Sequence, residues 1–157
     1  MISTSKLNIL TWPFRDLLIQ SLYRFDQNLI PFPWSLNGWK RLIGDQGYIL
    51  SMKFKGWKVC AVAFWRIEEL GDCLHLLKIG VRPDCQRLGL GKHLLDQAKN
   101  SRYFKGKMIL EVQAENDGAI SFYEQYGFRK LHKQASYYSN GEAAWTMIYS
   151  ARPASKG

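Results

Sequence analysis

One short segment constrains the fold of this chain more than any other. It consists of Gln86, Arg87, Leu88, Gly89, Leu90, Gly91 and Lys92. The apolar run before it, residues 74–81, is typical of a buried strand, and residues 93–99 have a helical pattern. A strand, a glycine-containing turn with two cations and a helix start favour phosphate binding, because the first helical turn has unpaired N–H groups and a partial positive charge. We therefore expect this segment to bind a phosphate-containing ligand.

The spacing of the glycines fits neither of two common phosphate-binding motifs. A nucleoside triphosphate loop has the pattern G-x-x-x-x-G-K-[ST], and aligning it on Gly91 and Lys92 puts Gln86 at the first glycine and His93 at the hydroxyl position. A dinucleotide-binding fingerprint needs a third glycine where Leu94 stands. What remains is the pattern Q-x-x-G-x-G between a strand and a helix.

Length and composition indicate one globular domain. The chain has 157 residues, of which 46% are hydrophobic and 22% are charged, so it can bury a sizeable core. No apolar run approaches the roughly 20 residues that cross a bilayer, and the N-terminus does not have the pattern of a secretory signal. We therefore expect a cytoplasmic protein with no membrane contact. The net charge of +9 suggests an acidic partner such as a polyanionic cofactor, a ribosome or a nucleic acid, or else a solvated basic surface.

The cysteines and histidines do not have the spacing of a metal site. Cys60, Cys73 and Cys85 are odd in number and contain no C-x-x-C pair, so we expect neither a disulfide framework nor structural zinc. The three histidines are scattered along the chain, and we interpret His75 as an ordinary core or edge histidine. We expect no metal.

Hydrophobic periodicity and turn signals predict the element order β-α-α-β-β-β-α-β-α-β-β. Ser35 and Asn116 are candidate N-caps, Gly127 is a candidate helix stop, and Asn140-Gly141 is typical of a hairpin turn. The order predicts an α/β class with a mixed, α+β type sheet, and residues 152–157 are predicted to be a frayed tail. We expect strands at residues 2–12, 48–53, 57–67, 74–81, 107–113, 128–138 and 144–149, and helices at 15–28, 36–43, 89–100 and 117–126.

Two motifs in this order resemble the GCN5-related N-acetyltransferase (GNAT) family. Residues 86–91 resemble its Q/R-x-x-G-x-G/A loop, which binds the pyrophosphate of acyl-CoA, and residues 116–128 resemble its second CoA motif, N-x-x-A-x-x-x-Y-x-x-x-G-F. The resemblance covers residues 74–149 and implies a GNAT fold with a splayed central sheet. It also implies acetyl-CoA as cosubstrate, bound in part by residues 86–92.

The same resemblance implies further cofactor contacts. The backbone of Ile79, Gly80 and Val81 would pair with the pantetheine arm of CoA where the sheet splays, and Asn116 would hydrogen-bond that arm. Gly80 fits a bulge in this strand, or else is a glycine tolerated in a plain buried strand. Asn116 also has a complete explanation as a helix N-cap, and the two roles are compatible.

Within the family, the chain resembles the bacterial ribosomal-protein-alanine acetyltransferases more closely. Three departures concern the acceptor side or its border: Cys85 replaces a frequent aromatic residue, the turn at residues 139–141 is short, and Ala143 replaces an acidic residue. They leave the acetyl-CoA prediction intact and leave the identity of the acceptor open. The segments that carry this closer resemblance are residues 32–35 (FPWS), 83–95, 110–112 (LEV) and 137–138 (YY).

Acetyl transfer to an amine needs a base for the amine and an acid for the departing thiolate. Glu111 is the candidate base, because burial in an apolar strand would raise the pKa of its carboxylate, and the resemblance assigns the glutamate of L-E-V this role through a water. The alternative is a carboxylate that only holds the sheet. Tyr123 is the candidate acid by its place in the Y-x-x-x-G-F motif, and the alternative is a packing aromatic.

These features predict an enzyme that transfers acetyl from acetyl-CoA directly to an amine, and the leading candidate acceptor is the N-terminal α-amine of a ribosomal or other protein. One alternative is a small amine or lysine side chain as acceptor. Another is a non-catalytic acyl-CoA-binding or ribosome-binding module, with nucleic acid as an indirect partner only. The segment at residues 32–34 and the pair Tyr137-Tyr138 are candidate walls of an acceptor site, or else packing groups at a corner of the fold.

Overall fold

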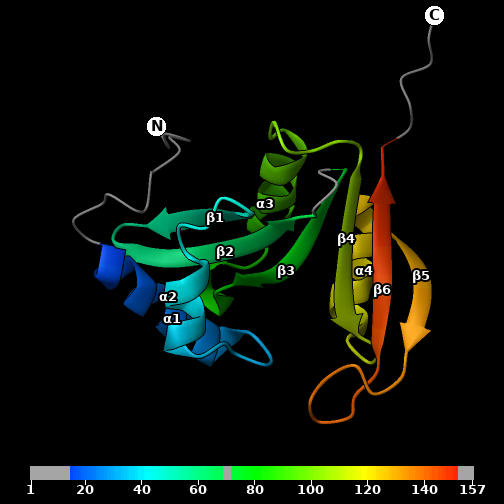
Figure 1. The fold of residues 1–157 in the computed structure, drawn as a ribbon, viewed down its shortest axis with the longest axis horizontal. Coiled ribbons are helices and arrows are strands. Elements are labelled where there is room, and N and C mark those ends of the chain that lie inside the picture. The colour runs from blue at the N-terminus through cyan, green and yellow to red at the C-terminus, as the bar shows by residue number, and fades with distance from the viewer. Residues whose placement is uncertain (1–14, 69–71, 152–157) are drawn as a thin grey trace, which may run out of the picture.

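A computed structural model describes residues 15–68 and 72–151 and contains a six-stranded mixed sheet with helices on both of its faces (Figure 1). The strand predicted at residues 2–12 and the tail at 152–157 lie outside the described residues. In chain order the elements are α1 (Arg15–Leu29), α2 (Leu36–Leu42), β1 (Tyr48–Lys55), β2 (Lys58–Ile67), β3 (Cys73–Val81), a 3₁₀ turn (Pro83–Cys85), α3 (Leu90–Lys99), β4 (Lys107–Gln113), α4 (Asp117–Tyr126), β5 (Arg129–Gln134) and β6 (Ala144–Ser150).

The sheet has the strand order β1-β2-β3-β4-β6-β5, in which only β3 and β4 run parallel. The β3–β4 ladder begins at Cys73 with Lys107 and ends at Leu76 with Leu110, although both strands continue beyond it. Figure 1 shows the two strands diverging toward their C-terminal ends. The splayed mixed sheet expected from the sequence is therefore confirmed.

Two apolar cores form, one on each face of the sheet. Helices α3 and α4 cover one face, where Trp65, Leu74 and Met108 are fully buried. Helices α1 and α2 cover the other face of the β1–β3 half, where Trp39 and Phe64 are buried. The side chains of successive strand residues point to opposite faces, so each strand of this half contributes to both cores.

The bulge in β3 lies at Leu77 and not at Gly80, which corrects the sequence-based expectation. Lys78 pairs with Phe64 and Leu76 pairs with Trp65, so Leu77 has no partner in the ladder. The extra residue moves Lys78 and Gly80 to the face that α1 covers. Gly80 is a glycine for a packing reason, because an added Cβ would lie 3.0 Å from Ile30 Cγ1 and from a ring carbon of Phe25.

Replacing Gly80 with Ala is expected to lower the free energy of unfolding by about 1–3 kcal/mol, because the new methyl group overpacks the α1–β3 contact. Gly118→Ala in α4 is the matched control, since the nearest atom to its added Cβ, Asn116 Oδ1, is 3.9 Å away. Chemical denaturation of both variants measures the difference. Equal loss of stability in the two variants would contradict the packing explanation.

The predicted helix ends are confirmed where local capping sets them. Ser35 Oγ accepts from Gly38 N at the start of α2, and Asn116 Oδ1 accepts from Ala119 N at the start of α4. Gly127 ends α4 with a φ of 111°, a left-handed conformation that glycine adopts at low cost.

The strand predicted at residues 128–138 is too long, because β5 ends at Gln134. Ser136 has a φ of 51°, which is incompatible with an extended strand. The Asn140-Gly141 turn forms, with Gly141 N donating to Tyr138 O at 2.9 Å, but it lies within a longer loop and does not join two paired strands directly. Among the described residues, no helix has the length and apolarity needed to cross a membrane.

Candidate active site

Glu111 lies on β4 at the point where β3 and β4 separate. Along β4, Met108, Leu110 and Val112 are buried against the α3–α4 core, so Glu111 points to the opposite face. Its carboxylate is 16% exposed, and its Oε2 lies 2.6 Å from His75 Nε2. The strand sequence predicts apolar surroundings for Glu111. The structure adds a polar neighbour, because the imidazole of His75 on β3 contacts the carboxylate directly.

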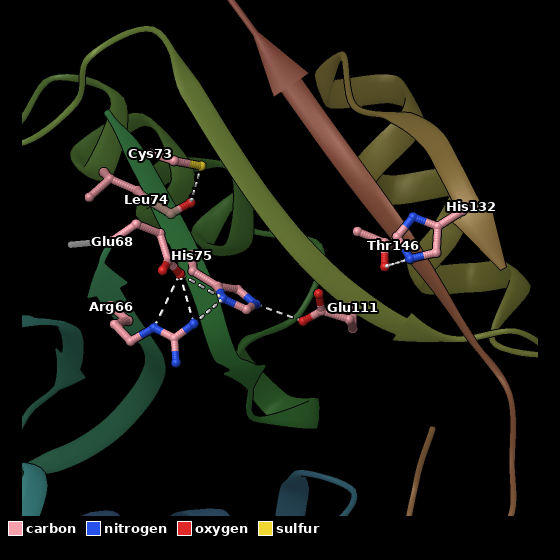
Figure 2. Close-up of polar contacts among 8 residues, drawn as sticks. All are labelled: Arg66, Glu68, Cys73, Leu74, His75, Glu111, His132 and Thr146. Carbon is pink, nitrogen blue, oxygen red and sulfur yellow. Dashed lines mark hydrogen bonds and ion pairs between the residues drawn. The ribbon is translucent and has the colours of Figure 1, made fainter. Parts of the chain in front are cut away.

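His75 belongs to a row of polar side chains that crosses three strands (Figure 2). Its ring is 12% exposed, and its Nδ1 lies 3.0 Å from Glu68 Oε1. Arg66 on β2 pairs with His75 in the antiparallel register, donates to Glu68 Oε1 at 2.8 Å, and places Nη2 3.1 Å from His75 Nδ1. The hydrogen bond from Glu68 N to Cys73 O, 3.1 Å long, holds this end of the row against β3.

The loop between β5 and β6 brings two tyrosines to the same place. Burial, the negative charge of Glu111 and a hydrogen bond with it raise the pKa of the Tyr137 phenol. Burial and the neighbouring Tyr137 raise the pKa of Tyr138 to about 12, and Glu111 contributes. Tyr138 also stacks on Phe32 from the α1–α2 segment, with ring centroids 4.3 Å apart and planes 11° from parallel.

A buried ion pair fixes the α1–α2 segment against the sheet. Asp26 on α1 is fully buried, and its Oδ1 accepts from Lys78 Nζ on β3 at 2.9 Å. Its Oδ2 accepts from Trp34 N at 2.8 Å and from Trp39 Nε1 at 2.9 Å, while Lys78 also donates to Phe32 O at 3.0 Å. The carboxylate is therefore fully hydrogen-bonded, which offsets the cost of removing the charges from water.

Tyr123 lies on α4 and is 5% exposed. Among the described residues its hydroxyl has no hydrogen-bond partner, and its ring contacts Phe122 and Phe128 edge-on or tilted. Burial raises the pKa of the Tyr123 phenol, with a smaller contribution from Tyr138, so the group keeps its proton across the neutral range. Glu111 and Tyr123 come from opposite faces of the sheet. Tyr138 lies within electrostatic reach of both, because Glu111 contributes to the raised pKa of Tyr138 and Tyr138 contributes to the raised pKa of Tyr123.

The segment predicted to bind phosphate leads directly into α3. Gly89 is the N-cap of α3 with a φ of 72° and offers no side-chain hydrogen bond, so the N–H groups of the first turn are not capped. Arg87 has a φ of 60°, which is strained for a residue with a Cβ. Gln86 Nε2 donates to Val81 O at 3.2 Å and ties the segment to the end of β3. An uncapped helix N-terminus after a strained turn fits an anionic group.

Two residues of this segment have explanations other than phosphate contact. An added Cβ at Gly91 would lie 3.1 Å from Phe122 Cζ, so this glycine allows α3 to approach α4. Lys92 Nζ lies 2.7 Å from Asp96 Oδ2 one turn along the helix. Leu88 is 67% exposed, which is consistent with a contact to a ligand at this surface.

Beyond the ladder with β4, the edge of β3 that faces β4 has no strand partner within residues 15–68 and 72–151. In this part of the chain, Ile79, Gly80 and Val81 pair with β2 only. A cleft of about 510 Å³ lies at the end of β4, next to the N-terminus of α4. It is lined by Gln113, Ala114, Glu115, Asn116, Glu142 and Ala143.

The comparisons with known proteins agree with this geometry. Residues 12–128 match the model of the Acetyltransferase (GNAT) family. The chain belongs to the GNAT family. It is therefore an acetyl-CoA-dependent N-acetyltransferase.

Individual relatives narrow the similarity within the GNAT family. The chain is 32% identical over 140 residues to the "[Ribosomal protein bS18]-alanine N-acetyltransferase" of Salmonella typhimurium, covering 87% of this chain and 92% of the relative. The corresponding protein of Escherichia coli K12 is 31% identical over 141 residues. The crystal structure of the Escherichia coli ribosomal-protein-S18-alanine N-acetyltransferase matches with a TM-score of 0.76, 28% identity and coverage of 88% and 91% of the two chains.

Cys85 lies in the 3₁₀ turn before residues 86–92. Its thiol is buried and lies 2.7 Å from Cys60 Sγ. The hydrogen bond with Cys60 and burial raise the pKa of the Cys85 thiol to about 11, so little thiolate forms at neutral pH. Cys85 is therefore a packing group rather than a nucleophile. It directly precedes residues 86–92, which we call the phosphate segment because they are predicted to bind phosphate.

Four residues of this candidate site are not predicted from the sequence. The sequence indicates only an ordinary histidine at His75, and it does not single out Glu68, Asp26 or Lys78. A signal was present, because Asp26 follows Leu22 at helical spacing on the apolar face of α1, and Lys78 interrupts the apolar run of β3. A charge within an apolar pattern needs a buried partner, and the two opposite charges could have been matched with each other.

Proposed function

We propose that the protein acetylates the N-terminal α-amine of another protein, with a ribosomal protein as the leading candidate. The observation that carries the proposal is the position of Glu111 at the splay of the sheet, next to an aromatic wall of Phe32, Tyr137 and Tyr138. An aromatic wall beside a carboxylate suits the first residues of a peptide with a free ammonium group. The bacterial relatives, by their names, acetylate an alanine of ribosomal protein bS18.

In this proposal, Glu111 removes the proton of the acceptor ammonium through a water molecule. Tyr123 protonates the CoA thiolate as it leaves, and its raised pKa keeps a proton available for this step. No covalent intermediate on the protein is needed, because the amine attacks the thioester directly. The roles of the two residues rest on their positions and on the family resemblance.

Acetyl-CoA would be bound at three places. The uncapped start of α3 and the strained turn before it, residues 86–92, would hold the pyrophosphate. The unpaired edge formed by Ile79, Gly80 and Val81 would pair with the pantetheine arm as a strand would. The oxygen of Asn116 caps α4, which leaves its amide nitrogen to donate to that arm.

The local charge near the site favours a cationic acceptor despite the net charge of the chain. Glu115 and Glu142 both line the cleft at the end of β4. The acidic residue that the family resemblance led us to expect at Ala143 is thus present one position earlier, as Glu142, where it hydrogen-bonds Gln113. A peptide with a free amine or a basic residue near its N-terminus would meet negative charge here.

A comparison of acceptors tests the proposal. Purified protein with acetyl-CoA is given a peptide with a free N-terminal alanine, the same peptide with a blocked N-terminus and an internal lysine, or spermidine. We expect the kcat/KM for the free N-terminus to exceed the other two by at least about 10-fold, a difference of roughly 1.4 kcal/mol. Thiol release and mass spectrometry of the peptides provide the readouts.

The other outcomes separate the alternatives. A preference for lysine or spermidine would replace the proposed acceptor class and keep the enzyme. CoA binding without thiol release for any acceptor would instead support a non-catalytic acyl-CoA-binding module.

A further inference from the structure

The two ring nitrogens of His75 both face carboxylate oxygens, from Glu111 on one side and Glu68 on the other (Figure 2). We propose that His75 is a positioning residue that holds Glu111 by a hydrogen bond and, together with Glu68 and Arg66, controls the strength of Glu111 as a base. This inference deepens the proposed function and rests on the role of Glu111 in it. His75 itself is not proposed to touch either substrate.

The hydrogen-bond inventory of the row supports two protonation states of His75. Carboxylates only accept, so the 2.6 Å contact requires a proton between His75 Nε2 and Glu111 Oε2. In the neutral ring, Nε2–H donates to Glu111 and Nδ1 accepts from Arg66 Nη2 at 3.1 Å. In the charged ring, Nδ1–H donates to Glu68 Oε1 at 3.0 Å. His75 can therefore gain or lose one proton while the heavy atoms stay in place.

The other titratable groups around this pair keep their charge state near neutral pH. Burial opposes ionisation of Glu68, but its hydrogen bonds with Arg66 and His75 outweigh burial and lower its pKa. The hydrogen bond with Glu68 raises the pKa of Arg66, and Tyr48 on β1 adds to this rise. From the β5–β6 loop, Tyr137 and Tyr138 have raised pKa values and stay neutral.

The charge state of His75 changes what Glu111 can do. A neutral imidazole orients the carboxylate and leaves it able to take the proton of the acceptor ammonium. An imidazolium places a full positive charge 2.6 Å from the carboxylate, which stabilises its anion and weakens it as a base. Enzyme activity should then fall on the acid side when His75 gains its proton.

The pH profile of kcat, at saturating acetyl-CoA and acceptor peptide, tests this inference in the full chain. His75→Gln keeps an N–H donor but cannot titrate, so its acid limb should move to lower pH by about one unit, while the plateau falls less than about threefold. Glu68→Gln should move the limb in the same direction, because the charged ring loses the negative charge that faces its Nδ1. The double variant should match His75→Gln, since Glu68 acts through His75.

Two further variants calibrate the profile. His75→Ala removes the donor altogether and should lower kcat about tenfold through loss of orientation, with an unchanged KM for acetyl-CoA. His132→Gln is the matched control, because His132 contacts Thr146 Oγ1 at 3.3 Å and not Glu111. Its profile should coincide with that of the wild type. Coincident profiles of wild type and His75→Gln would overturn the proposal. Additive shifts in the double variant would show that Glu68 acts independently of His75, which would contradict its role in the proposal.

A measurement on the protein without substrates separates this inference from the proposed function. The chain has three histidines, so nitrogen NMR can follow the titration of His75 directly. We expect Glu111→Gln and Glu68→Gln each to lower the pH at which His75 loses its proton. If the wild type acetylates no acceptor but these shifts occur, the proposed function fails and the coupling stands. If the enzyme is active and the titration does not respond, the coupling fails.

Discussion

Replacing Glu111 with Gln is expected to lower kcat for acetyl transfer by about 10²–10³-fold. The amide keeps the shape of the side chain and cannot accept a proton from the acceptor ammonium. The deficit should shrink above about pH 9, because a peptide α-amine has a pKa near 8 and is then already neutral. Glu111 is not among the residues proposed to hold acetyl-CoA, so the Kd for acetyl-CoA should stay within about twofold.

Steady-state kinetics across pH and calorimetric binding of acetyl-CoA measure these effects. Glu124→Gln is the matched control, because Glu124 is an exposed residue of α4 whose contact is a 3.6 Å ion pair with Lys130. Unchanged turnover in Glu111→Gln would show that the carboxylate only holds the sheet. A deficit that stays constant at alkaline pH would show that Glu111 acts other than by removing the proton of the amine.

Replacing Tyr123 with Phe is expected to lower kcat by about 10²-fold, because the departing thiolate loses its proton donor. Stability should hardly change, since the Tyr123 hydroxyl has no hydrogen-bond partner among the described residues and the ring stays in place. The raised pKa of Tyr123 means that this phenol should not titrate below about pH 10, so it should not produce the acid limb of the wild-type profile.

Tyr126→Phe should show the opposite pattern. Tyr126 donates to Asp96 Oδ1 at 2.9 Å, so its loss should cost about 1 kcal/mol of unfolding free energy and affect kcat much less. Thermal denaturation and initial rates of thiol release distinguish the two variants. If Tyr123→Phe loses stability and keeps its kcat, then the tyrosine is a packing aromatic.

Local sequence determined the elements of this protein and the ends of most of them. Ser35, Asn116 and Gly127 act within three or four residues of their own positions, so their effects can be predicted without tertiary structure. The phosphate segment is equally local, because a turn and the helix that follows it form one continuous stretch of chain. The sequence thereby determined the order of the described elements, the turn proposed to bind an anion and the candidate pair Glu111 and Tyr123.

The tertiary structure decided which groups surround Glu111. The bulge at Leu77 sets which residues of β3 share a face, and it puts Lys78 rather than Leu77 in contact with Asp26. His75 and Glu111 are 36 positions apart, and they meet because the short parallel ladder ends just before Glu111.

The same is true of the aromatic wall. Phe32 and Tyr138 stack although they are more than 100 positions apart in the chain, and no periodicity in either segment predicts this contact. Such contacts depend on strand register and on the packing of helices against the sheet, which are properties of the whole chain. The sequence by itself therefore determined the chemical groups of the site, and only the tertiary structure decided which of them act on one another.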